Sequence, residues 1–146
     1  MFKFETYTQE AHAFVNKVAL ALGTDDPSQA SRVITAFFHA LRDRISTEES
    51  LHFISQLPFF LRAVYVDGWK LSPKNIRAGN LEEFINTVRV RCGYTAIKDL
   101  GNDLNAERTL RQLISVIREY VDQGELDDII AQLPDEIGDL FERTEV

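Results

Sequence analysis

Three histidines and one cysteine are the side chains of this 146-residue chain best suited to metal binding or nucleophilic chemistry. His12, His39 and His52 do not lie three or four residues from one another or from Cys92, so none of these pairs shares a helical turn. His39 precedes Asp43 by four residues, which allows a side-chain pair on one helix but does not make a catalytic or metal site. The histidines are therefore interpreted as surface or half-buried residues.

One metal-like spacing is present around His52. Helical di-metal proteins carry Glu-x-x-His pairs on inward faces, and Glu49 and His52 have that spacing. Glu125 and Asp128 occupy the matching places in a repeat described below. Each glutamate is also the third residue of a helix-capping sequence, which explains it without a metal. We therefore expect no metal site, no cofactor and no catalytic residue.

The sequence lacks the familiar catalytic motifs. It contains no Gly-x-Ser-x-Gly turn, no Gly-x-Gly-x-x-Gly and no Gly-Lys-Ser or Gly-Lys-Thr loop. Cys92 falls on the apolar face of its predicted helix, beside Gly93, as a buried inert thiol would. These observations favour a protein that is not an enzyme, although they leave an enzymatic role open.

Cations and aromatic residues gather near the middle of the chain. Residues 62–98 hold seven basic and three acidic residues, whereas residues 99–146 hold four basic and thirteen acidic ones. Arginine and aromatic residues dominate binding hot spots. The candidate interaction patch consists of Arg62, Tyr65, Trp69, Lys70, Lys74 and Arg77. We expect it to bind an acidic partner, which is either the acidic end of a second copy or another protein. The alternative is that the two aromatic residues cover the end of the core.

Helical periodicity and capping signals place the elements that must position this patch. They predict an all-α fold of eight helices without a sheet. The predicted helices cover residues 7–22, 27–45, 47–57, 58–65, 81–92, 106–120, 123–133 and 134–142. The two long helices should bury Phe37, Phe38, Leu41, Leu113, Ile114 and Ile117.

The tripeptide Gln56-Leu57-Pro58 recurs as Gln132-Leu133-Pro134, 76 positions later. Around it, residues 30–65 align with residues 106–141 without a gap, and about six residues are inserted within residues 94–105. A shared helix breaker at a fixed distance favours an internal duplication. We predict a single domain over residues 1–146 with pseudo-twofold symmetry. Its parts are a first four-helix unit (about 5–66), a connector (67–79) and a second four-helix unit (about 80–143).

The segments Ala40-Leu41-Arg42-Asp43-Arg44-Ile45, Gln56-Leu57-Pro58, Leu61-Arg62, Tyr65 and Gly68-Trp69, followed by the second Gln-Leu-Pro, carry a family resemblance. This pattern resembles the Domain of Unknown Function 2267 family over nearly the whole chain. The resemblance implies an all-helical bacterial protein. It supplies no activity, cofactor or catalytic residue.

These observations lead to one functional hypothesis with two alternatives. We expect a non-catalytic protein-interaction or adaptor module, with a protein partner or a homo-oligomer formed through the basic–aromatic connector. The first alternative is a small-molecule or anion-binding protein, with an enzyme included in that class, that has a cavity between the repeats. A weaker alternative is a DNA-binding regulator, but the net charge of −7 argues against nucleic acid as a partner. The lone cysteine and the lack of a signal peptide or long apolar run predict a cytoplasmic protein without membrane contact.

Overall fold

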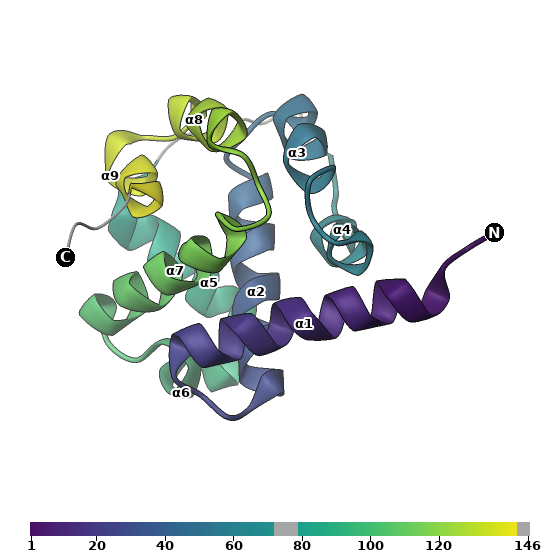
Figure 1. Cartoon of the computed structure of the whole chain (residues 1–146). Coiled ribbons are helices and arrows are strands. Elements are labelled where there is room, and N and C mark those ends of the chain that lie inside the picture. The colour runs from purple at the N-terminus through teal and green to yellow at the C-terminus, as the bar shows by residue number, and fades with distance from the viewer. Residues whose placement is uncertain (72–78, 143–146) are drawn as a thin grey trace.

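The computed structural model describes residues 1–71 and 79–142, and this part of the chain is helical without any strand (Figure 1). The all-α prediction is therefore confirmed. The α-helices are α1 (Phe4–Leu22), α2 (Pro27–Arg42), α3 (Thr47–Ile54), α4 (Phe59–Val66), α5 (Leu81–Cys92), α6 (Ala96–Leu100), α7 (Asp103–Ile117), α8 (Gln123–Gln132) and α9 (Asp135–Gly138). Two 3₁₀ turns, η1 (Gly93–Thr95) and η2 (Asp139–Phe141), complete the described elements.

Side-chain caps fix the start of several helices as the sequence predicts. The Ser46 hydroxyl accepts the backbone N–H of Glu49 at 3.1 Å, and the Asp122 carboxylate accepts that of Glu125 at 2.8 Å. Asn80 caps α5 in the same way. Pro58 and Pro134 occupy the N-cap positions of α4 and α9, one residue before the first turn in which they were expected.

Several helix boundaries differ from the prediction, and one helix was not predicted. Helix α1 begins at Phe4 rather than after Thr6, and the backbone N–H of Tyr7 donates to Lys3 O at 3.0 Å. The packing of this turn on α4 outweighs the local capping signal. Helix α2 ends at Arg42, so Ile45 is buried in a turn instead of a helix. Helix α6 was not predicted, and it lies within the insertion at residues 94–105.

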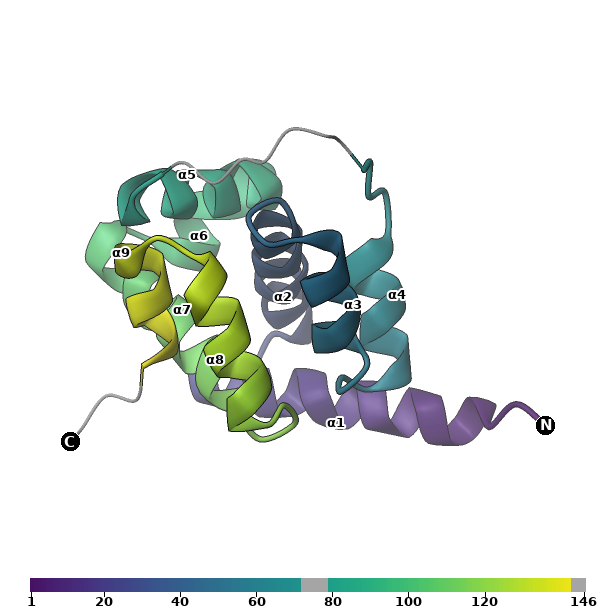
Figure 2. The ribbon, with the colours of Figure 1, turned by 90° about the horizontal axis from the view of Figure 1, so that it is seen from above.

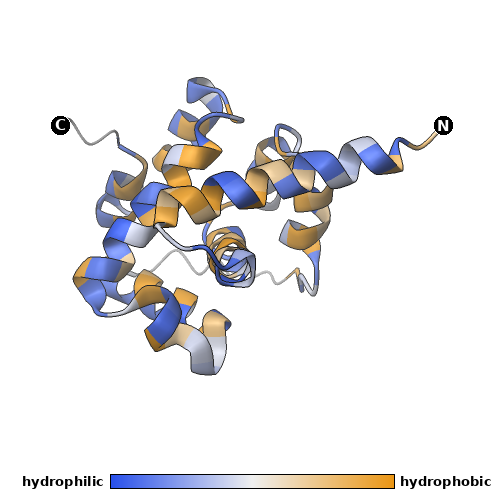
Figure 3. Ribbon diagram, turned by 60° about the horizontal axis from the view of Figure 1, so that its bottom comes forward, coloured by the Kyte–Doolittle hydropathy of each residue, from blue (hydrophilic) through white to orange (hydrophobic). Residues whose placement is uncertain are grey.

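Helix α2 is the centre of the bundle. It packs against α1, α4 and α5, while α7 packs against α1 and α5. Helices α3 and α8 lie side by side at one end of the molecule (Figures 1 and 2). Helix α1 crosses the base of the bundle, and its N-terminal end extends past α4 in both views. Polar and apolar residues alternate along α1, which is typical of a helix buried on one side (Figure 3).

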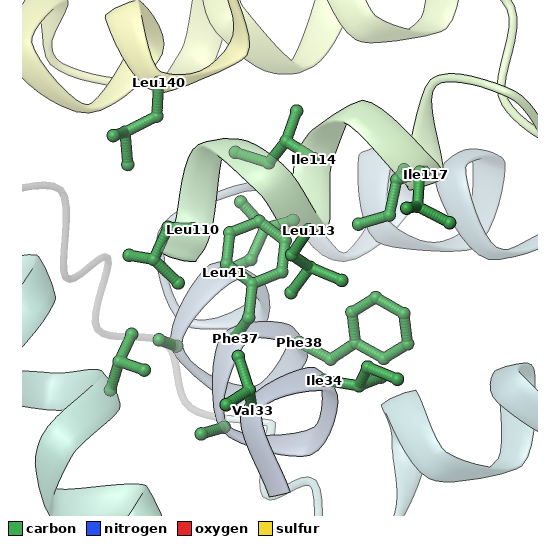
Figure 4. Packing of buried hydrophobic residues seen from close by; sticks show 14 of the residues in the cluster. Val33, Ile34, Phe37, Phe38, Leu41, Leu110, Leu113, Ile114, Ile117 and Leu140 are labelled. Atoms are coloured by element: carbon green, nitrogen blue, oxygen red, sulfur yellow. The ribbon is translucent and has the colours of Figure 1, made fainter. Parts of the chain in front are cut away.

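The core forms where α2 faces α7 (Figure 4). The six residues predicted for it have no measurable exposure: Phe37, Phe38, Leu41, Leu113, Ile114 and Ile117. This part of the sequence prediction is confirmed. In the described part of the chain, no helix has the length and apolar character needed to cross a membrane.

Candidate functional site

Helix α4 and the turn after it carry the described members of the predicted basic–aromatic patch. Arg62 and Trp69 are half-buried, and Lys70 is exposed. Lys74 and Arg77 lie outside the described residues, so their part in the patch stays a prediction from the sequence.

Tyr65 belongs to the core and not to the surface. Its ring centroid lies 5.5 Å from that of Phe38 and 5.8 Å from that of Phe53, and the side chain is 0% exposed. The Tyr65 hydroxyl lies 2.6 Å from the Ser50 hydroxyl, and burial raises the pKa of the phenol. A partner cannot reach a side chain in this position, so Tyr65 does not serve the binding surface as the sequence suggested.

Trp69 covers the open end of this aromatic cluster. Its ring meets that of Tyr65 edge-on, with 5.8 Å between centroids. The Arg42 guanidinium lies 5.9 Å from the Trp69 ring centroid, and its Nη1 donates to Tyr65 O at 2.7 Å and to Asp67 O at 2.8 Å. The end of α4 is thus closed by a buried arginine and a tryptophan, which matches the alternative interpretation of these aromatic residues.

Arg62 joins α4 to the end of α3. Its Nε donates to Leu57 O and its Nη2 donates to Ser55 O, both at 3.0 Å. These bonds pair carbonyl groups that a helix end leaves without intrahelical partners. The guanidinium also lies 5.7 Å from the centroid of the Phe59 ring. Arg62 is therefore held at the edge of an aromatic surface.

That surface, called here the α1–α4 face, consists of Phe2, Phe4, Tyr7, Thr8, Phe59, Phe60 and Ala63. These residues line a hollow of about 420 Å³. Four of the phenylalanines stay more than half exposed: Phe2 at 74%, Phe4 at 71%, Phe59 at 52% and Phe60 at 55%. Tyr7 stacks on Phe59 with 4.4 Å between centroids, which holds the two helices together. The sequence signal for this surface was that α4 is apolar on most of its sides. Packing against the core requires apolar residues on one side only.

A second cluster lies between α3 and α8, where glutamines from the two Gln-Leu-Pro segments cross to the opposite helix. The Gln56 side chain accepts the backbone N–H of Asp122 at 2.7 Å and donates to its carboxylate at 2.9 Å. The Gln132 side chain accepts the backbone N–H of Ser46 at 2.8 Å. Each glutamine therefore bonds the N-cap residue of the other segment's helix.

These crossed bonds change the role of Glu49 and Glu125. In a capping box the third-position glutamate accepts the N-cap backbone N–H. Here the glutamines already take that N–H at both caps. The sequence predicted that each glutamate carboxylate accepts the N-cap backbone N–H of its own helix. That prediction is wrong, because a glutamine accepts this N–H at both caps.

The carboxyl groups of Glu49 and Glu125 are buried beside each other. The two residues are 8% and 7% exposed, and the Oε2 atom of each has no hydrogen-bond partner. Burial, reinforced by the neighbouring Glu49 carboxylate, raises the pKa of Glu125 to about 8. His52, whose side chain is 60% exposed, places Nδ1 4.0 Å from Glu49 Oε2.

Replacing Glu125 with glutamine is expected to alter how stability depends on pH. Because the folded pKa of Glu125 lies above its ordinary value of 4.5, its stabilising contribution is complete below that value and is lost as pH rises through about 8. Glutamine keeps the shape without the charge. In metal-free buffer, the difference in unfolding free energy between E125Q and the natural chain should therefore shift in favour of E125Q by about 1–3 kcal/mol as the pH rises from acidic to alkaline. Thermal denaturation across that range measures it, with exposed Glu48→Gln as control. Parallel stability curves for the natural chain and E125Q would contradict the prediction.

Among the described residues, the remaining histidines and the cysteine do not come together in a further site. His39 Nε2 lies 2.9 Å from Val64 O, and burial lowers the pKa of this imidazole. Burial raises the pKa of the half-buried Cys92 thiol to about 11, which keeps it protonated near neutral pH. His12 is exposed on α1. A hollow of about 500 Å³ runs along α7, and its lining residues all come from that helix rather than from both halves.

The sequence profile of the family described as "Uncharacterized conserved protein (DUF2267)" matches residues 11–140. The match covers most of the helical bundle, and the chain belongs to this family. None of the curated proteins matches the chain. The expected family is therefore confirmed, and its description names no activity.

Proposed function

We propose that this chain is a non-catalytic protein-binding module whose binding surface is the α1–α4 face. The partner is an amphipathic helix of another protein, with an apolar side and an acidic residue at its edge. The observation that carries the proposal is the group of four phenylalanines that stay more than half exposed around one hollow.

The composition of the α1–α4 face supports an apolar ligand. Soluble monomers rarely expose large contiguous apolar patches unless the patch binds something. The lining of the hollow contains no charged residue, so it suits the apolar side of a helix, which inserts side chains at spacings of three and four. Rigid aromatic rings supply much of the binding energy at such surfaces.

The acidic residue of the partner is inferred from Arg62. Its guanidinium lies beside Phe59 at the edge of the hollow, and backbone carbonyls hold it in place. An exposed ion pair contributes only about 0–1 kcal/mol, so this charge sets orientation while the aromatic rings supply affinity. Lys70, Lys74 and Arg77 follow α4 in the sequence, and their part in binding stays a prediction from the sequence.

The test is site-specific photo-cross-linking in the cell of origin. A photoreactive amino acid replaces Phe60, whose side chain is 55% exposed, and the cross-linked peptide is identified by mass spectrometry. We expect a peptide from another protein with apolar residues three and four apart and at least one acidic residue. The same amino acid at Ile97, which is 86% exposed and distant in sequence, is the control.

Several outcomes would overturn the proposal. Cross-links from position 60 to a second copy of this chain would replace the partner with a homo-oligomer. Equal products from positions 60 and 97 would mean that the α1–α4 face has no preferred ligand. A basic or uniformly polar cross-linked segment would contradict the assigned chemistry.

We also propose that the two halves arose by duplication and are related by a pseudo-twofold axis. The support is that aligned residues make the same kind of contact. Gln56 and Gln132 each bond the opposite N-cap. Arg42 donates to Tyr65 O and Arg118 to Phe141 O, and both pairs are aligned in the sequence. A reducing cytoplasm is part of the same proposal, supported by the single cysteine.

The duplication makes a prediction about the two glutamines. Because Gln56 and Gln132 bond opposite N-caps, Gln56→Ala and Gln132→Ala should each lower the free energy of unfolding by about 1 kcal/mol. Urea denaturation measures both losses, and Gln9→Ala, at an exposed position on α1, is the control. A large loss in one variant and none in the other would contradict equivalent roles.

A further inference from the structure

We propose that Glu49, His52 and Glu125 form a binding site for a divalent ion of the Zn²⁺ class between α3 and α8. This site is separate from the α1–α4 face and does not depend on the proposed function. Its ligands would be one carboxylate oxygen from each glutamate and Nδ1 of the histidine.

The geometry already brings one ligand atom from each of the three residues together. These atoms lie within 4.8 Å of one another. In a tetrahedral zinc site with ligands at about 2.1 Å, neighbouring ligand atoms are about 3.4 Å apart. The 4.0 Å between His52 Nδ1 and Glu49 Oε2 is close to that value. The His52 side chain is 60% exposed, so its ring has room to adjust toward the two carboxylates.

The two glutamates of this group each carry one unpartnered carboxylate oxygen. Glu49 and Glu125 are 8% and 7% exposed, and neither Oε2 atom has a hydrogen-bond partner. A buried acceptor without a donor is costly, and the two adjacent carboxyl groups repel each other when both are ionised. The crossed glutamines remove the capping role that would otherwise occupy these carboxyl groups. A bound cation would satisfy both oxygens and neutralise both charges.

The surrounding groups favour a cation and orient one of its ligands. Asp122 and Asp128 add negative charge near Glu125. Gln132 Nε2 donates to Glu49 Oε1 at 3.4 Å, which leaves Oε2 of the same carboxylate facing the cluster. Hydrogen bonds of this kind to ligating carboxylates orient them in metal sites.

The donor set selects the class of ion. Mg²⁺ prefers oxygen ligands and retains several waters, whereas Zn²⁺ accepts an imidazole nitrogen together with carboxylates. Three protein ligands leave a fourth position, on the exposed His52 side, for water. Because the ligands come from α3 and α8, the ion would join the two halves and stabilise the folded chain by mass action.

Isothermal titration of the full chain with ZnCl₂, after treatment with EDTA, tests the site. We expect one saturable site and a higher thermal denaturation temperature with zinc. His52→Ala should weaken zinc affinity by at least about tenfold. Removing a residue that only hydrogen-bonds to a metal ligand already costs about that much, and His52 would be a ligand itself. Its stability without zinc should stay unchanged, since the side chain is mostly exposed. Glu125→Gln should weaken zinc affinity as well.

The control is His12→Ala, which removes an exposed histidine on α1 and should leave zinc affinity unchanged. Absence of saturable binding would overturn the site. Equal zinc affinity in the natural chain and His52→Ala would also overturn it, as would a loss of affinity in His12→Ala instead. MgCl₂ that displaces zinc at equal concentration would contradict the assigned class of ion.

Discussion

Phe38→Ala is expected to lower the free energy of unfolding by about 3–5 kcal/mol. Phe38 is 0% exposed, and its ring lies 6.1 Å from Phe53 and 5.5 Å from Tyr65, centroid to centroid. Truncation removes the ring from a close-packed interior and leaves a cavity that the surrounding helices cannot fill completely. Urea denaturation followed by circular dichroism measures the loss.

The matched control is Phe4→Ala, because Phe4 is 71% exposed and should change stability by no more than about 0.5 kcal/mol. A loss below about 1 kcal/mol in Phe38→Ala would mean that the site collapses around the missing ring. The contact between α2 and α4 would then contribute far less to the bundle than its packing indicates.

Arg42→Met is the second change with a large expected effect. Arg42 is 3% exposed, and its Nη1 donates to the carbonyls of Tyr65 and Asp67 at the end of α4. Methionine preserves most of the side-chain volume but leaves both carbonyls without this donor. Since hydrogen bonds to charged groups contribute about 1.5–3 kcal/mol each, we expect a loss of about 2–4 kcal/mol.

The same denaturation experiment, together with tryptophan fluorescence, measures this variant. Trp69 lies against the Arg42 guanidinium, so its emission should shift to longer wavelength as the end of α4 opens. Arg108→Met, on the exposed side of α7, should change neither stability nor emission. Stability and emission unchanged in Arg42→Met would show that these two bonds do not hold the end of α4.

Local sequence signals were sufficient for most of the helices and for the six predicted core residues, but not for α6. The stripe that contains Phe37, Phe38 and Leu41 repeats at steps of three and four, and that spacing identifies core positions of α2 correctly, although residues 36–42 are all buried in the bundle. Caps such as Ser46 act within one helical turn, so their role can be inferred from neighbouring residues. The start of α1 was misplaced because contact with α4 prevailed over a cap of the same kind.

The candidate sites depend on contacts between residues far apart in the sequence. Phe4 and Phe59 form one surface only because α1 runs past α4. Likewise, a capping box read from the sequence assigns Glu49 to its own helix, whereas Gln132 takes that bond from the other half. Tyr65 was assigned to a surface because periodicity cannot distinguish a buried aromatic residue from an exposed one in a helix that is apolar on most sides.

The most direct test of the proposed function is a nuclear magnetic resonance titration. A synthetic peptide covering the helix cross-linked to position 60 is added to the ¹⁵N-labelled chain, and backbone amide shifts are followed. Binding to the α1–α4 face predicts that the largest changes occur at Phe4–Thr8 and Phe59–Ala63, and that Phe60→Ser abolishes them while Ile97→Ser does not. Changes centred on α7 or on the α3–α8 cluster, or changes that persist in Phe60→Ser, would contradict the account.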